Sequence, residues 1–254
     1  MALDSPALIL ICSALFTVAL LYGCVGQAGA SGFVAVMALF GLAPETLKPT
    51  ALVLNVLVSS VVAARFCRSG HFSWALLWPF LVASLPAAFV GGYLSLPVAA
   101  FSAALGTLLL LAGLPFLVRK PDHQARAMPP SRPASATAGG SIGLLSGLTG
   151  MGGGVLLTPL LLYCQWATPR TATAVSAVFI FVNSAVALLG HLTASMRLPP
   201  GLAWMALAAV LGGALGAQLG SRHLPLQAVY RVLGITLVAR SEEHTSELQS
   251  HLNL

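Results

Sequence analysis

The segment GLTGMGGGVLLTPL, residues 147–160, places five glycines and a proline in a run of otherwise apolar residues. Glycine and proline both destabilise a helix interior, so a helix that crosses a bilayer is expected to break here. Small residues also line one face of packed membrane helices, but the three consecutive glycines at 152–154 point in every direction. The pattern therefore predicts a broken membrane helix, whereas the glycines at 91–92 and 216–220 are expected to serve helix packing.

The whole chain has the composition of a membrane protein. Of its 254 residues, 57% are hydrophobic and 7% are charged, whereas about a quarter of the residues in a soluble domain are charged. Successive apolar stretches approach the roughly 20 residues that span a bilayer as a helix. They cover 6–22, 51–64, 74–94, 98–118, 141–164, 172–190, 202–219 and 226–239. We predict an all-α, polytopic membrane protein with about eight transmembrane segments.

The two halves of the sequence resemble each other, which indicates an internal duplication. The matching positions are Gly23, Gly26 and Gly29 with Gly147, Gly150 and Gly153, and the segment 96–106 with 224–234. We predict two tandem repeats, 1–118 and 139–239, each with a Gly-broken first helix. The first repeat has GQAGASG at 26–32 and lacks the triple glycine, which predicts a milder break there.

Two segments lie outside the repeats. The basic, Pro- and Ser-containing segment 119–138 is expected to be a flexible linker, and by the positive-inside rule it is cytoplasmic. That places the protein in the inner (plasma) membrane as a multi-pass chain without a cleavable signal peptide. The polar segment 240–254 resembles a translated sequencing adapter, so we expect it to be an assembly artefact that truncates the last helix.

A broken helix can bind an anion. The break frees backbone N–H groups at the start of the next half-helix, where the helix dipole is positive. Paired, Gly-interrupted segments are typical of secondary transporters, whose solute lies at the breaks. Outside 240–254 the acidic residues are Asp4, Glu45 and Asp122, none of them inside an apolar stretch. Because cation pumps keep a carboxylate at depth, these features favour a small anionic solute.

The candidate substrate-binding residues come from the two breaks and the helices that follow them. They are Gly26, Gly29, Gly150, Gly152, Gly153 and Gly154 in the breaks, and Asn55, Ser59, Ser60, Asn183 and Ser184 in the helices. The side chains of the second group could bind an oxyanion or link neighbouring helices, and the sequence leaves both roles open.

Other classes of site have little support in the sequence. HExxH and GxSxG motifs are missing, and the histidines and the four cysteines are scattered, so no enzyme, metal site or cofactor is expected. The cations are spread over connections, so nucleic acid is not expected as a partner. His71 and His191 both follow a glycine at the end of a long apolar run and are expected to face the membrane interface.

Two stretches resemble a known family. GLLSGLTGMGGGVLLTPLLL at 143–162 and TPRTATAVSAVFIFVNS at 168–184, together with the tandem repeats, resemble the sulfite exporter TauE/SafE family. The resemblance covers 1–239 and implies a transporter that exports sulfite or a related organosulfur anion. A non-transporting membrane scaffold or assembly subunit is the alternative function.

The topology of the repeats stays open at this point. If each glycine segment crosses the membrane once, the two repeats are parallel. If each glycine segment is re-entrant, the repeats are inverted. Both arrangements place the linker on the inside, so the charges do not separate them.

Overall fold

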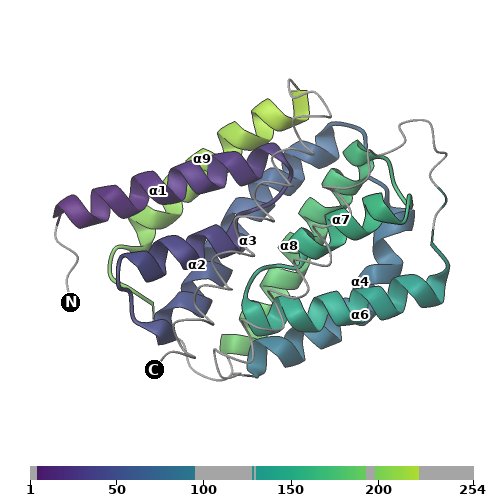
Figure 1. Cartoon of the computed structure of the whole chain (residues 1–254), viewed down its shortest axis with the longest axis horizontal. Coiled ribbons are helices and arrows are strands. Elements are labelled where there is room, and N and C mark those ends of the chain that lie inside the picture. Colours follow the sequence, from purple (N-terminus) through teal and green to yellow (C-terminus); the bar gives the residue numbers. More distant parts are fainter. Residues whose placement is uncertain (1–4, 95–127, 129, 193–197, 223–254) are drawn as a thin grey trace, which may run out of the picture.

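The computed structural model describes residues 5–94, 128, 130–192 and 198–222, and within these ranges the chain forms helices and no strands (Figure 1). The match between 96–106 and 224–234, the linker up to residue 127, the truncated last helix and the segment 240–254 lie outside the described residues.

Six long helices and two short ones make up the described part. The long helices are α1 (Ser5–Cys24), α3 (Pro44–Arg68), α4 (Trp74–Tyr93), α6 (Arg132–Thr149), α8 (Pro169–Leu192) and α9 (Leu202–Arg222), and the short ones are α2 (Ala30–Leu39) and α7 (Gly154–Tyr163). Helices α3 and α8 cross the centre, between a pair formed by α1 and α9 and a pair formed by α4 and α6 (Figure 1).

Glycines pack both outer pairs with their backbones in contact. Along α6, Gly139, Gly143 and Gly147 lie against Phe80, Ser84 and Ala88 of α4, and along α9, Gly212, Gly216 and Gly220 lie against Phe16, Leu20 and Cys24 of α1. A Cβ at any of these glycines would overlap a backbone carbonyl of the partner helix. Gly91 and Gly92 of α4 likewise lie against the backbones of Leu144 in α6 and Ala187 in α8. The packing role expected for the glycines at 91–92 and 216–220 is therefore confirmed. The order of the contacts shows that the helices of both pairs run parallel.

Five of the described helices are long and apolar enough to cross a membrane. These spans are Pro6–Cys24, Glu45–Arg68, Trp74–Tyr93, Pro169–Leu192 and Leu202–Ser221. Large apolar side chains on their outer faces are exposed, as Ile9 is at 68% and Trp204 at 63%. An all-helical chain with apolar outer faces matches the expected polytopic membrane protein.

The two central helices are antiparallel. Three pairs of neighbouring residues show this, namely Lys48 with His191, Asn55 with Ser184, and His71 with Arg170. We call the end at which Lys48 and His191 lie the lysine end, and the end at which Arg68 and Arg170 lie the arginine end.

The chain reverses its direction at each glycine segment. Residues 25–29, the first break, separate α1 from α2, and residues 150–153, the second break, separate α6 from α7. At the start of α2, Gly32 lies against Val18 of α1. After α7, the carbonyl of Gln165 accepts a hydrogen bond of 3.1 Å from the amide of Met128, close to the start of α6.

Two expectations need correction. The first break is as complete as the second, because α1 ends at Cys24 and α2 begins only at Ala30. Helix α6 begins at Arg132, so the segment expected as a flexible linker is helical over 132–138. Ser131 stands at the N-cap position and a proline follows in the first turn, and both are signals that start a helix.

Candidate functional site

The second break is built from glycines in a conformation that other residues avoid. Gly150, Gly152 and Gly153 have φ values of 72°, 71° and 71°, in the left-handed region. A residue with a Cβ loses about 1–2 kcal/mol in this region, and glycine does not. Helix α7 starts directly afterwards at Gly154, and the first N–H groups of a helix have no partner inside it.

The same break lies against two polar side chains at the middle of the central helices. Nδ2 of Asn55 in α3 donates a hydrogen bond of 2.6 Å to Oγ of Ser184 in α8. A Cβ on Gly152 would lie 2.7 Å from Oγ of Ser184 and would overlap Nδ2 of Asn55. Both side chains are fully buried. Three of the predicted residues are therefore brought together here, and only glycine at 152 lets the backbone approach them.

The first break lies near the start of α8. Gly26 and Gly29 are left-handed, with φ values of 74° and 95°. A Cβ on Gly26 would overlap the methyl group of Thr173, four residues after the start of α8. Between the glycines, Gln27 is 2% exposed, and its Nε2 has no hydrogen-bond partner among the described residues. The first break thus also contains a buried polar side chain, that of Gln27.

The other predicted residues bind their own helices or pack closely. Hydroxyl groups of Ser59 and Ser60 donate to the carbonyls of Val56 and Leu57, and Ser60 is partly exposed. Nδ2 of Asn183 donates to the Phe179 carbonyl at 3.0 Å. A Cβ on Gly154 would overlap the side chain of Ile180. Ser60 therefore lies apart from the group formed by Gly152, Asn55 and Ser184.

Several buried polar atoms within the described residues have no hydrogen-bond partner, and the sequence analysis missed most of them. They are Nε2 of Gln27, Oγ of Ser31, Ser146 and Ser176, Oγ1 of Thr50 and Thr158, and Oδ1 of Asn55 and Asn183. All lie in the first break, in α2, α3, α6, α7 or α8. Leaving such an atom unpaired costs about 1–3 kcal/mol, so their concentration marks a polar interior with unused hydrogen-bonding capacity. Their signal in the sequence is a lone polar residue in an apolar run beside a break.

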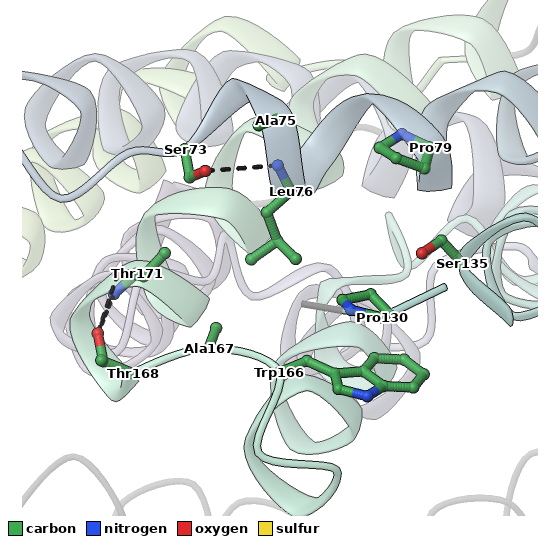
Figure 2. Close-up of a pocket in the computed structure, with 10 residues that line it drawn as sticks. All are labelled: Ser73, Ala75, Leu76, Pro79, Pro130, Ser135, Trp166, Ala167, Thr168 and Thr171. Carbon is green, nitrogen blue, oxygen red and sulfur yellow. Dashed lines mark hydrogen bonds between the residues drawn. The ribbon is translucent and has the colours of Figure 1, made fainter. Parts of the chain in front are cut away.

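A separate cavity of about 310 Å³ opens at the arginine end. In Figure 2, Ser73, Leu76 and Pro79 of the α4 region face Trp166 and Thr168 across it. The hydroxyl of Ser73 accepts a hydrogen bond from the Leu76 amide, and that of Thr168 accepts one from the Thr171 amide, so both hydroxyls cap helices. The walls are mainly apolar and differ from the polar surroundings of the breaks.

In the part of the chain that the structure describes, no group of three or more His, Cys, Asp or Glu side chains is placed to hold a metal ion.

The sequence is similar to one protein family and to two membrane transporter proteins. Residues 10–241 match the sulfite exporter TauE/SafE family. The chain is 38% identical over 230 residues to the probable membrane transporter protein y4hK of Sinorhizobium fredii. The aligned region covers 89% of this chain and 93% of that protein. It is also 41% identical over 87 residues to a probable membrane transporter protein of Xylella fastidiosa. That aligned region covers 33% of this chain and 31% of the Xylella protein. No solved structure is significantly similar to the chain.

Proposed function

The chain belongs to the sulfite exporter TauE/SafE family, which comprises membrane transporters and not enzymes, and from that premise we propose that it exports sulfite or a related organosulfur anion. We propose further that it works as a secondary transporter and that the anion binds at the glycine breaks.

The observation that carries the proposal is the contact of Gly152 with Asn55 and Ser184. It brings irregular backbone to two buried polar side chains at the middle of the central helices. Irregular backbone is tolerated in a membrane protein only where protein or a water-filled cavity surrounds it. Backbone N–H groups at the start of α7 and these side chains would together supply hydrogen-bond donors to an oxyanion.

The distribution of charge supports an anion over a cation. Glu45 is the only acidic residue within the described ranges, and it lies in the exposed first turn of α3. A transported cation needs a counter-charge at depth, whereas an anion is stabilised by backbone donors and by a helix dipole.

The proposed architecture is a pair of inverted repeats. Corresponding helices of the two halves, such as α3 and α8, run in opposite directions and make corresponding contacts. Helix α4 ends at the lysine end, where Lys48 binds Leu94, and α6 begins at the arginine end, where Arg132 lies over Trp78. The apolar stretches 98–118 and 226–239 lie outside the described residues, and their length and composition alone support the proposal that each adds a crossing. With the six long helices this gives about eight long segments.

The same arrangement suggests an orientation in the membrane. Arg65, Arg68, Arg132 and Arg170 lie at the arginine end, opposite Lys48. By the positive-inside rule we propose that the arginine end and the segment 119–138 face the cytoplasm of an inner membrane. Export then runs from the arginine end to the lysine end.

The test is anion flux in proteoliposomes that contain the full chain. We expect sulfite to move faster than sulfate or chloride. Ser184→Ala should lower sulfite flux, because it removes a buried hydroxyl that lies against the second break. The matched control is Ser60→Ala, which removes a partly exposed hydroxyl from α3 and should leave the flux unchanged.

Each outcome has a distinct meaning. Wild-type sulfite flux that both variants retain would contradict the proposed location of the site. A folded, inserted wild-type protein that moves no anion would favour the membrane scaffold or assembly subunit as the function.

A further inference from the structure

We propose that Lys48 and Arg170 are the two cations that bind the anion as it enters or leaves, one at each end of the α3/α8 pair. This inference rests on the function proposed above and adds two specific residues and a direction to it.

Lys48 is a half-buried ammonium group, and within the described residues its hydrogen bonds go to neutral backbone carbonyls. Its Nζ donates to the carbonyl oxygens of Gly91, Gly92 and Leu94, at 3.3, 3.1 and 3.1 Å, at the C-terminal end of α4. An oxyanion is a stronger acceptor for an ammonium group than a neutral carbonyl is, so an arriving anion can replace these carbonyls.

The side chain of Lys48 also leads to the second break. Its Cγ would lie 3.4 Å from a Cβ built on Gly150, the residue that ends α6. Asn55 lies two helical turns further along α3, where Gly152 meets Ser184. Lys48 therefore lies at the lysine end of the protein, two helical turns from the buried polar group at the second break.

Arg170 has the corresponding place at the other end. It is exposed in the first turn of α8, where its Nη1 lies 3.5 Å from Nε2 of His71, at hydrogen-bond distance. Thr173, one turn further along α8, contacts Gly26 of the first break. Each break thus contacts a central helix that has one cation in its first turns, α8 with Arg170 at the first break and α3 with Lys48 at the second.

The cavity shown in Figure 2 lies beside the start of α8, and Arg170 itself is not among the residues that line it. Thr168 and Thr171, which flank Arg170 in sequence, line that cavity of about 310 Å³, and Ser73, two residues after His71, lines it as well. At the lysine end the corresponding neighbour is His191, which lies against Gly92 and close to Lys48.

Because α3 and α8 are antiparallel, the two cations serve opposite faces of the membrane. Neutralising one of them should therefore weaken anion uptake from one side only. A purely structural Lys48 would act differently, because its loss would lower the stability of the protein without a preference for one direction of flux.

The experiment compares Lys48→Gln and Arg170→Gln with wild type in proteoliposomes of known orientation, with sulfite supplied from each side in turn. We expect Arg170→Gln to raise the half-saturating sulfite concentration at least about tenfold for flux that starts at the arginine end. Lys48→Gln should do the same for flux that starts at the lysine end. Lys48→Arg and Arg170→Lys, which keep the charge, should restore most of the affinity.

Arg68→Gln is the matched control, because Arg68 is an exposed cation in the last turn of α3 at the arginine end. Its half-saturating concentration should not change. If Lys48→Gln does not fold, the exposed Arg170 still tests the proposal. Wild-type flux with an unchanged or direction-independent response in the variants would overturn this inference alone, whereas no wild-type flux would overturn the proposed function as well.

Discussion

The two glycine breaks reverse the chain in the same way with different sequences. Each has a pair of left-handed glycines three residues apart, Gly26 with Gly29 and Gly150 with Gly153. Each pair ends one helix and starts the next. The reversal therefore depends on these two positions in each break and does not require three consecutive glycines.

The breaks differ at the position between the paired glycines. The second break has a third left-handed residue, Gly152, where the first break has Ala28, which is buried and does not have a positive φ. Gly152 lies against Asn55 and Ser184, whereas the close contact of the first break is with Thr173. The additional glycine thus serves the approach to buried polar side chains and not the reversal itself.

The largest effect is expected from Gly152→Ala, which gives the second break the residue that the first break has. The new Cβ would overlap Asn55 and Ser184, and the alanine would have to adopt the left-handed φ of Gly152. We expect sulfite flux in proteoliposomes to fall below about a tenth of the wild-type rate, because the side chains that line the break must move.

Gly41→Ala separates the two causes. Gly41 has the same φ of 71°, but a Cβ there meets nothing within 4 Å. The variant should lose only about 1–2 kcal/mol of stability, from the strain of a left-handed alanine, and should keep its sulfite flux. Equal losses of flux in the two variants would show that backbone strain, and not the contact with Asn55 and Ser184, is responsible.

A smaller and reversible effect is expected at the first break. Gly26→Ala would place its Cβ on the methyl group of Thr173. Adding Thr173→Ser removes that methyl group and keeps the hydroxyl that donates to the Pro169 carbonyl at 2.9 Å. The double variant should regain part of the thermal stability and flux lost in Gly26→Ala.

The matching test at the second break should give a different result. Adding Ser184→Ala to Gly152→Ala leaves the overlaps with Asn55 and Ile180 in place. A recovery as large as that at the first break would contradict the view that several side chains surround Gly152.

Much of this comparison could be predicted from the sequence, but its key step could not. The apolar runs and the glycine spacing predicted the helices, the breaks and the packing of 216–220, because membrane spans and close helix contacts leave local patterns. Asn55 and Ser184 were also predicted from the sequence as candidate substrate-binding residues. Their contact with Gly152 depends on how α3, α8 and the break pack together, and a pattern within one segment does not contain that information.

Two errors have the same physical origin. The first break was expected to be milder because GQAGASG has fewer consecutive glycines, yet only the residues that adopt a left-handed φ decide the reversal. The start of α6 was missed because 119–138 was interpreted by its overall composition. Ser131 and Pro133 are helix-starting residues in that setting, and their position outweighs the average.

The smallest expected effect concerns the side chain of Thr149, the last residue of α6, directly before the second break. Oγ1 of Thr149 accepts a hydrogen bond of 3.1 Å from the Met151 amide and donates one of 3.2 Å to the Ser146 carbonyl. In the first break, the amides of Gly26 and Gln27 bind the Gly23 and Tyr22 carbonyls of the preceding turn. Thr149→Val keeps the shape and removes both bonds, so we expect a loss of about 1 kcal/mol in stability.

The matched control is Thr137→Val, in the same helix, where the hydroxyl is exposed and binds the carbonyls of Pro133 and Ala134. Because water can satisfy those carbonyls, this variant should melt close to the wild-type temperature. Thermal unfolding in detergent measures both, and sulfite should stabilise Thr149→Val less than wild type if the Met151 amide helps to shape the anion site. Equal melting temperatures for the two variants would mean that the glycines alone hold the second break, as they do the first.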